Sequence, residues 1–279
     1  MKNKLYINFI ILILSTSVFG QNKCFTIQDS ITSTSISYAN IWHNNKIYAN
    51  SDANGEFCVK AVDLNGTFTI SCVGYITKPF NLDLNTIRLE KDKINLEEVV
   101  VVVPKRKQKI KLGKTNPTNV LLTATYDLTI SEIGKSFKLN NEKQLYLKEV
   151  KFKTSTYQHG RIMGLKIYSL NENEEPDQLL STENIILNIE KGSTITTYAF
   201  EENIIPLPKN GFFVSLQMLL TEENKQYGVN NDLKDWYFYN PSIGANKGVE
   251  NAFYFTKTVE NIWKKIPNYD LNMKVLLTD

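Results

Sequence analysis

Residues 95–111 read NLEEVVVVVPKRKQKIK, and this stretch decides how the chain divides. An uninterrupted run of valine is typical of a strand buried on both faces of a sheet. Pro104 lacks the N–H that a central strand needs, so it ends the run. Six basic residues and no acidic residue lie between Pro104 and Pro117, a composition typical of an extended linker. We therefore predict a first domain, residues 21–103, that closes with these valines, followed by a basic linker, residues 104–117.

The segment before the valines has the pattern of an all-β domain. Short apolar or β-branched runs recur about every ten residues between Cys24 and Val103, separated by turn residues, which favours a β-sandwich. Asn54-Gly55 predicts a tight hairpin turn, because both residue types tolerate positive φ. The same segment has part of the spacing of a calcium loop. Ala61 stands where that loop needs a bidentate glutamate, so the turn is favoured over a metal site.

Three cysteines allow at most one disulfide within the chain. Alternation along residues 67–73 predicts that Cys72 is a buried core thiol. Cys24 and Cys58 are each out of phase with their apolar neighbours, so both should point outward from their strands. Three reduced thiols are therefore favoured, and a bridge between Cys24 and Cys58 is the alternative, as the one pairing that the strands allow.

Several motifs in sequence order resemble the carboxypeptidase regulatory-like domain, a transthyretin-like β-sandwich found in TonB-dependent receptors and other envelope proteins of Gram-negative bacteria. They are Asp29, YANIW (38–42), SDANGEF (51–57), FTISCVGY (68–75), IRLEKD (87–92) and LEEVVVV (96–102). The resemblance implies that the valines form the closing strand. Phe25 departs from the family, which usually has a small glycine in the first strand. In the receptors a similar acidic and valine segment is the TonB box, so a partner-docking peptide is the alternative for the valine run.

The strand pattern resumes in longer runs after Asn116 and predicts a second sandwich over residues 118–279, of the jelly-roll-like kind. The eight runs are LYLKEVKFKT, RIMGLKIYSL, ENIILNIE, TITTYAFE, GFFVSLQMLL, DWYFYN, AFYFTK and LNMKVLL. Parts of this region are similar to a β-sandwich module that follows the regulatory-like domain in many envelope proteins. That similarity implies architecture and no activity. The fold class expected for the whole chain is all-β.

The N-terminus predicts export. Lys2 and Lys4 precede an apolar run and then small residues, which is the pattern of a signal peptide covering residues 1–20. The apolar run is shorter than the roughly 20 residues that span a bilayer, so a membrane anchor is the less favoured alternative. Loss of this peptide lowers the formal charge from +3 to +1, which gives no electrostatic case for binding nucleic acid.

The usual catalytic signatures are missing from the sequence. A carboxypeptidase zinc site needs two histidines and a glutamate, with one histidine three residues before the glutamate. Lys46 and Ile162 stand three residues after the two histidines, His43 and His159, which we interpret as a strand-edge and a turn residue. No nucleophile elbow, P-loop or dinucleotide fingerprint is present, and no cofactor is expected. A pair of carboxylates brought together by the fold would still make a hydrolase.

Aromatic residues are the remaining candidates for a binding site. Rings exposed beside polar groups can stack on sugars, although most aromatic residues of β proteins belong to the core. The candidate ligand-binding residues are Tyr227, Tyr237, Tyr239 and Trp263. Residues 224–234 and 239–251, rich in asparagine and glycine, are predicted to be loops that rim such a site.

These observations predict a non-catalytic, exported envelope protein, periplasmic or associated with the outer membrane or cell surface. It would act as a binding or structural module for an envelope protein or a surface glycan. The alternatives are a glycan-binding accessory protein, a TonB-linked docking protein and a carboxylate-based hydrolase. The linker is interpreted as a solvated spacer, and contact with an anionic surface through its basic side chains is the alternative. These are Lys105, Arg106, Lys107, Lys109 and Lys111.

Overall fold

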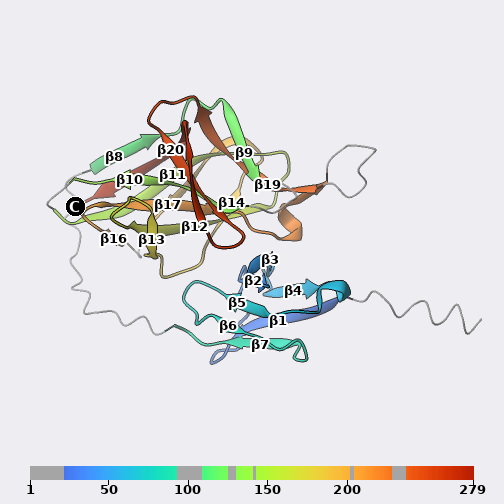
Figure 1. The fold of residues 1–279 in the computed structure, drawn as a ribbon. Helices are drawn as coiled ribbons and strands as arrows, with labels where there is room; N and C mark the ends of the chain where they lie inside the picture. Colours follow the sequence, from blue (N-terminus) through green and yellow to red (C-terminus); the bar gives the residue numbers. More distant parts are fainter. Residues whose placement is uncertain (1–21, 93–108, 125–129, 141–142, 202–203, 228–236) are drawn as a thin grey trace, which may run out of the picture. The chain divides into compact units, whose positions relative to one another are not determined.

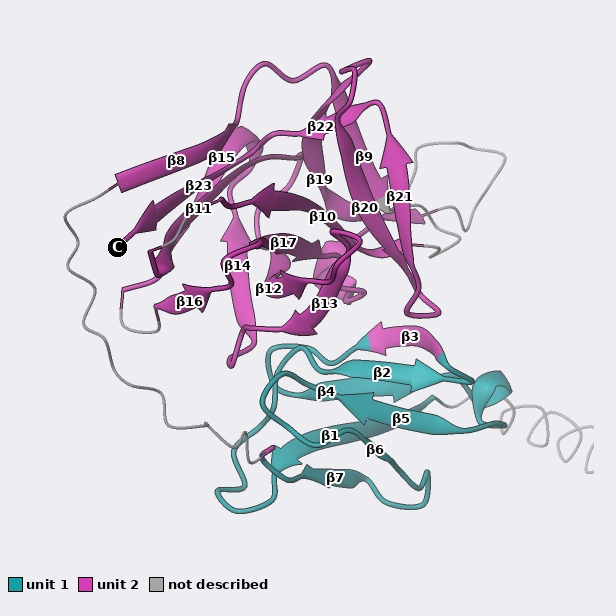
Figure 2. Ribbon diagram, turned by 60° about the vertical axis from the view of Figure 1, so that its left-hand side comes forward, with its two compact units in different colours: residues 1–45, 50–91 teal, residues 46–49, 92–279 magenta. Residues whose placement is uncertain are grey.

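The computed structural model describes residues 22–92, 109–124, 130–140, 143–201, 204–227 and 237–279. The predicted signal peptide, the valine run and the basic residues Lys105, Arg106 and Lys107 lie outside the described residues. Within these ranges the chain is all-β, as predicted, and its helical segments are two short 3-10 turns. It divides into two compact units, one of residues 1–45 and 50–91 and the other of residues 46–49 and 92–279 (Figure 2).

The N-terminal sandwich contains a three-stranded sheet and a four-stranded sheet (Figure 1). The first has the order β4 (Glu56–Val59), β1 (Lys23–Asp29), β7 (Thr86–Leu89), and the second has the order β3 (Lys46–Asn50), β2 (Asn40–His43), β5 (Phe68–Ser71), β6 (Lys78–Pro79). β1 runs antiparallel to β4 and parallel to β7. Apolar and polar residues alternate along β1 and β4, so one side of their sheet supplies the core.

Phe25 is part of this core rather than a disturbance of it. Its ring stacks on Phe57 from β4 with 5.2 Å between centroids, and Phe80 lies edge-on to it at 5.5 Å. Phe80 also contacts Phe68 from the other sheet, with 5.6 Å between centroids. Offset and edge-on ring pairs add to the free energy gained by burial. The aromatic ring therefore fills the place where the resemblance leads one to expect a glycine.

The disulfide that the sequence offered only as the alternative, between Cys24 and Cys58, is present in the structure. Cys24 and Cys58 lie directly opposite each other on β1 and β4, and their Sγ atoms are bonded. Both side chains point away from the core because their neighbours Phe25 and Phe57 point into it. The prediction for Cys72 is wrong. β5 ends at Ser71, so the alternation that would have buried Cys72 stops one residue earlier, and Cys72 is only partly buried.

The turn at Asn54-Gly55 is present, but it does not close a hairpin. Gly55 has φ +76°, and the Asp52 carboxylate accepts hydrogen bonds from the N–H groups of Asn54 and Glu56 at 2.9 and 2.7 Å. The strands on either side of the turn, β3 and β4, belong to different sheets. The turn therefore carries the chain from one sheet to the other, a difference that local turn chemistry does not encode.

The C-terminal sandwich contains a seven-stranded and a nine-stranded sheet. The seven-stranded sheet has the order β13 (Pro176–Leu179), β12 (Arg161–Leu170), β17 (Gly211–Gln217), β10 (Ile130–Lys138), β20 (Phe253–Thr258), β21 (Trp263–Pro267), and β14 (Ile185–Ile189) also pairs with β12. The nine-stranded sheet has the order β18 (Lys225–Tyr227), β19 (Tyr237–Lys247), β11 (Leu145–Thr156), β23 (Met273–Thr278), β8 (Lys109–Lys114); β15 (Gly192–Ala199) and β16 (Ile205–Leu207) pair with β11, and β22 (Tyr269–Leu271) and β9 (Val120–Ala124) pair with β19.

Alternating apolar side chains from both sheets are fully buried, and this burial holds the C-terminal sandwich together. They include Leu165, Ile167, Val214, Leu216 and Ile133 from the seven-stranded sheet and Leu147, Val150, Phe152, Met273 and Leu277 from the nine-stranded sheet. All eight predicted runs contribute strands. The other strands of this sandwich were not predicted, because they are short, polar or at sheet edges: β8, β9, β10, β13, β16, β18, β21 and β22.

The predicted linker is wrong over its second half. Residues 109–114 form β8, which pairs antiparallel with β23 from Lys109 opposite Thr278 to Lys114 opposite Met273. Ile110 and Leu112 are partly buried while Lys109 and Lys111 are exposed, so the strand has one apolar and one basic side. This alternation was overlooked in the sequence because the many lysines of the segment favoured its interpretation as a charged linker. The C-terminal sandwich therefore includes residues 109–114, which lie before the predicted start at residue 118.

Substitution of Gly113 by alanine tests this assignment. Gly113 has φ +76°, and a Cβ there would lie 2.2 Å from the carbonyl oxygen of Met273 in β23. We expect Gly113→Ala to lower the free energy of unfolding by about 2–4 kcal/mol, from backbone conformation and overpacking together. Urea denaturation of the two proteins measures the change.

Gly160 provides the matched control, because it has φ +74° but nothing within 4 Å of the position that a Cβ would take. Gly160→Ala should cost only the conformational part, about 1–2 kcal/mol. Equal losses in the two variants would show that residues 109–114 are not packed as a strand.

Candidate functional site

Three of the four predicted aromatic residues come together on the β18–β19 hairpin. Tyr227 is paired with Tyr237, and Lys225 is paired with Tyr239, so these side chains share one face of the hairpin. The ring centroids are 6.1 Å apart for Tyr227 and Tyr237 and 5.8 Å apart for Tyr237 and Tyr239, both with near edge-on geometry. We call these three residues the tyrosine ladder.

Exposure decreases along the tyrosine ladder. Tyr227 is 59% exposed, Tyr237 is partly buried and Tyr239 is 8% exposed. Burial, followed by the neighbouring Tyr237 and Glu222, raises the pKa of Tyr239, so its phenol stays protonated at neutral pH. The outer two rings are therefore accessible and the third anchors them in the sandwich.

Lys225 adds a positive charge to the tyrosine ladder. Its Nζ lies 4.5 Å from the ring centroid of Tyr237 and 5.4 Å from that of Tyr227, within the range of cation–π contacts. The same ammonium forms an ion pair of 3.1 Å with Glu222. Burial alone would lower the pKa of Lys225, but its hydrogen bonds to Glu222 and Tyr227 raise it overall. Lys225 is therefore charged at neutral pH and fixed beside the rings.

Trp263 does not belong to this group. It lies on β21 in the seven-stranded sheet, where its ring is 5.1 Å from Phe213 and 5.8 Å from Tyr168, both edge-on. These contacts make Trp263 a partly buried member of an aromatic cluster that also contains Phe255. The sequence placed Trp263 with the tyrosines on residue type alone, and only the strand order separates them.

The predicted rim at residues 239–251 is wrong over residues 239–247. β19 continues to Lys247, and its residues from Tyr239 to Asn246 are buried. Its polar side chains are satisfied inside the sheet; the Asn246 Nδ2 donates to Asn272 Oδ1 at 2.6 Å. Gly244 leaves room for Lys153, whose Cγ would lie 2.7 Å from a Cβ at this position. The asparagine and glycine content of this segment therefore reflects packing and not a loop. Of the other predicted rim, Lys225–Tyr227 is β18, and residues 228–234 lie outside the described residues.

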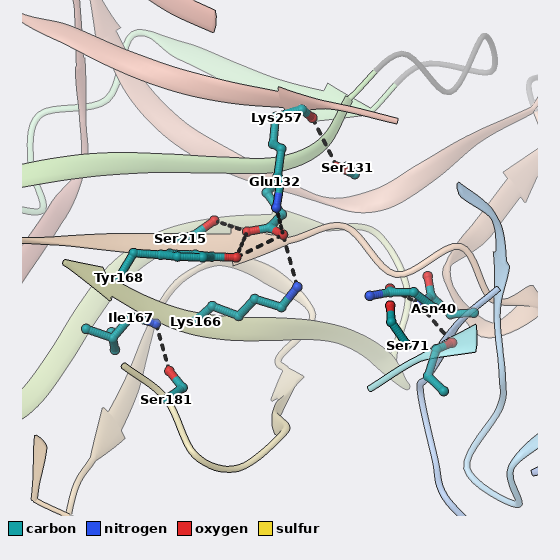
Figure 3. A network of polar contacts seen from close by, with 12 residues as sticks. Asn40, Ser71, Ser131, Glu132, Lys166, Ile167, Tyr168, Ser181, Ser215 and Lys257 are labelled. Atoms are coloured by element: carbon teal, nitrogen blue, oxygen red, sulfur yellow. Dashed lines mark hydrogen bonds and ion pairs between the residues drawn. The ribbon is translucent and has the colours of Figure 1, made fainter. Parts of the chain in front are cut away.

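A buried ionic cluster in the seven-stranded sheet was not predicted from the sequence. Glu132 of β10 is 3% exposed, and Lys166 of β12 and Lys257 of β20 approach its carboxylate at 3.0 and 3.6 Å. Ser215 donates a hydrogen bond to Glu132 at 2.8 Å, and Tyr168 donates one at 3.0 Å. Figure 3 shows the two lysines reaching the carboxylate from opposite sides.

Strand register explains how these residues meet. Glu132 is opposite Lys257, and Lys166 is opposite Ser215, so their side chains share one face of the sheet. Gly134 stands opposite Ser215 and has no side chain; a Cβ there would lie 2.4 Å from the ring of Phe213. A lysine inside the apolar run GLKIYSL was the available signal, since a buried lysine requires a carboxylate partner. The partner, Glu132, could not be identified from the sequence because its strand, β10, was not predicted.

The ionic cluster holds Glu132 in its charged form. Burial alone would raise the pKa of Glu132, but the positive charges of Lys166 and Lys257 and the hydrogen bonds of Lys166 and Ser215 lower it to about 2. Burial, opposed by Glu132, lowers the pKa of Lys257. A carboxylate with four donors and so low a pKa is a poor proton carrier near neutral pH, so we assign the cluster a structural role.

Arg161 is a second buried charge that was not predicted from the sequence. It opens β12 on the side that Met163, Leu165 and Ile167 direct into the core, and it is 4% exposed. Its Nη1 donates to the backbone oxygen of Lys225 at 3.3 Å, and its Nη2 donates to the Gln158 side chain. Its Nε is buried without a hydrogen-bond partner. Arg161 therefore crosses from one sheet to the strand that carries the tyrosine ladder.

The two histidines do not gather metal ligands around them. His43 ends β2, where its Nε2 lies 2.7 Å from the Asn65 carbonyl oxygen, and His159 is exposed in the turn before β12. Among the described residues, no group of three or more histidine, cysteine, aspartate and glutamate side chains could hold a metal ion. In that part of the chain no helix has the length and apolar character needed to cross a bilayer.

Comparisons with known proteins add little to this geometry. No protein-family model and no curated protein matches the chain. Among solved structures it is similar to the infectious bursal disease virus VP2 subviral particle, with 11% identity and a TM-score of 0.30 over 92% of this chain and 60% of that chain. The Gx strain of the same virus gives 13% identity and a TM-score of 0.30 over 93% and 62%. The chain thus spans about 60% of those chains, and the likeness carries no argument about function.

Proposed function

We propose that this chain is an exported, non-catalytic binding module of the Gram-negative cell envelope, periplasmic or associated with the outer membrane or cell surface. Its ligand is a surface glycan, bound by the C-terminal sandwich at the tyrosine ladder. The observation that carries the proposal is the pairing of Tyr227 with Tyr237 beside the Lys225 ammonium. Partly exposed tyrosine rings present an apolar face to the C–H side of a sugar and a hydroxyl to its polar edge.

Export is supported by the disulfide between Cys24 and Cys58. Disulfides of this kind form and persist in oxidising compartments such as the periplasm and the cell surface. The exposed side of β8 offers a further envelope contact, because Lys109 and Lys111 both point to solvent and would attract an anionic surface.

A binding role is favoured over a hydrolase by the state of the buried carboxylate. Glu132 is held charged by two lysines and two hydroxyl donors, which leaves it without a proton to give near neutral pH. We therefore propose that this group stabilises the sandwich and takes no part in chemistry.

Tyr237→Ala tests the proposed site. We expect it to weaken binding to a glycan selected from an array by at least about tenfold, because a central aromatic contact is typical of residues that dominate binding. Isothermal titration calorimetry with the selected glycan measures the loss.

Tyr269→Ala is the matched control. Tyr269 is also partly buried, pairs edge-on with another tyrosine, Tyr254, at 5.5 Å, and lies on β22, which pairs with the opposite end of β19. It should leave the affinity unchanged. The proposal fails if the wild-type protein binds no glycan, or if both substitutions weaken binding equally.

A further inference from the structure

The Cys24–Cys58 disulfide lies on the outer face of the three-stranded sheet. Both cysteines are exposed, while their neighbours Phe25 and Phe57 are buried on the inner face. The bridge joins β1 to β4, two strands that are already paired within one sheet. It differs in this from the disulfide of antibody domains, which joins two sheets through the core. The side chains that carry its sulfur atoms therefore face solvent and not the interior of the sandwich.

The surface around the bridge is polar and open to solvent. Glu56, two residues before Cys58 on β4, is exposed. Thr86 and Arg88 of β7 are also exposed, and Thr86 is on the same face because it lies opposite Thr26 of β1. Thr26 in turn lies opposite Glu56. A thiolate can therefore approach the bridge from water without displacing the core.

Exposure decides whether a disulfide reacts while the protein is folded. Thiol–disulfide exchange begins when a thiolate attacks a sulfur atom, so its rate depends on access to that atom. Exposed bridges are also the labile ones, whereas the structural bridges of secreted proteins resist reduction. We propose that the Cys24–Cys58 disulfide is a site of thiol–disulfide exchange in the folded protein, with a dithiol that carries an accessible thiolate as its co-substrate.

The reaction is balanced by the dithiol alone. Its thiolate attacks the Sγ of one cysteine, the Sγ–Sγ bond breaks, and the other cysteine leaves as a thiolate that takes a proton from water. The second thiol of the dithiol then attacks the dithiol's own sulfur in the mixed disulfide and releases the first cysteine, which is protonated in the same way. The dithiol is oxidised to a disulfide, and the protein gains two electrons and two protons.

Exchange at this site couples the N-terminal sandwich to the redox state of its surroundings. The bridge closes a loop with a sequence separation of 34 residues, so its reduction frees the unfolded chain and lowers the folded fraction of this unit. The two thiols stay opposite each other on paired strands while the sheet is folded, so an oxidant can close the bridge again. The site is thus a reversible redox modification that does not involve the proposed glycan.

Reduction kinetics of the full chain with dithiothreitol test the inference. The Cys72→Ser variant is used, so that the thiol of Cys72 cannot exchange with the bridge. Free thiols are alkylated at timed intervals and counted by mass spectrometry. We expect a rate that is first-order in dithiothreitol and changes by less than about twofold with urea below the unfolding transition, because attack on an exposed bridge needs no opening of the sheet. Reduction through global unfolding would accelerate about fivefold or more per molar urea.

Ile41→Val, added to the same variant, separates the two routes independently. Ile41 is fully buried in β2, in the sheet that does not carry the bridge. We expect this substitution to raise the unfolding equilibrium constant about fivefold, the ordinary effect of removing one buried methyl group, and to leave the reduction rate unchanged.

The inference is overturned if reduction accelerates in Ile41→Val by the same factor as unfolding, if it accelerates steeply with urea, or if the bridge stays intact until the protein unfolds. Each of these results leaves the proposed function standing, since glycan binding is measured with the bridge closed. Failure of the protein to bind any glycan, in turn, leaves the exchange site untouched.

Discussion

Glu132→Gln is expected to lower the free energy of unfolding of the C-terminal sandwich by about 3–5 kcal/mol, since removing one partner of a buried ion pair leaves uncompensated charge. Here two ammonium groups, Lys166 and Lys257, would lose the one carboxylate that the described residues place within 4.0 Å of them. Both lysines are mostly buried, with side chains 10% and 16% exposed, so water cannot replace the carboxylate cheaply. Urea denaturation followed by circular dichroism measures the loss.

Two controls separate this effect from a general sensitivity to lost charge. Glu174 pairs with Lys138 at the surface, with a side chain 43% exposed, and Glu174→Gln should cost at most about 1 kcal/mol. Replacing Glu132, Lys166 and Lys257 together by apolar residues of similar volume should restore most of the stability lost in Glu132→Gln. The structural role is contradicted if Glu132→Gln costs no more than Glu174→Gln.

Acid provides an independent measurement of the same cluster. The pKa of Glu132 is about 2 in the folded protein, against an ordinary value of 4.5. A lowered pKa contributes stability that is complete above the ordinary value and is lost as the pH falls through the folded value. We expect the wild-type protein to lose about 3 kcal/mol more than Glu132→Gln between pH 4.5 and pH 2, because the other carboxylates titrate in both proteins.

Loss of the disulfide is expected to destabilise the N-terminal sandwich by about 3–4 kcal/mol. The bridge closes a loop with a sequence separation of 34 residues, which restricts the unfolded chain. This unit has two small sheets and a limited core, so the crosslink is a large fraction of its stability. Urea denaturation with and without reductant, and of the variant in which Cys24 and Cys58 are both serine, measures the effect.

Cys72→Ser is the control for this prediction, because Cys72 takes no part in the disulfide. Its unfolding should depend on reductant as strongly as that of the wild-type protein. An unchanged urea midpoint of the N-terminal unit after complete reduction would contradict the assigned role of the bridge.

Much of the fold was predictable because its strands are strongly patterned. Alternation placed Phe25 and Phe57 in the core and Cys24 and Cys58 outside it, which is how the bridge was found. Alternation fails where charge or length obscures it. β8 was predicted to be a linker because of its lysines. The buried half of β19 was predicted to be a loop because it is rich in asparagine and glycine. In both places the pairing partner, far away in sequence, decides that the segment is a strand.

The candidate site was only partly predictable. Tyr237 and Tyr239 were found because they alternate within the run DWYFYN. Tyr227 was found because it lies close to that run in sequence, and it pairs with Tyr237. Trp263 was wrongly grouped with them, since residue type does not reveal which sheet a strand joins. Arg161 and Glu132 were missed because a buried charge is recognised from its neighbours across strands, and register between distant strands is a property of the whole fold.

The central claim, that a glycan binds at the tyrosine ladder, is tested most directly by NMR of the full chain with labelled tyrosine and tryptophan rings. During titration with a glycan from the array, we predict saturable shifts of the Tyr227 and Tyr237 ring signals, assigned by substitution, and an unchanged indole signal of Trp263. A saturable shift at Trp263 with no change at Tyr227 and Tyr237 would contradict the claim.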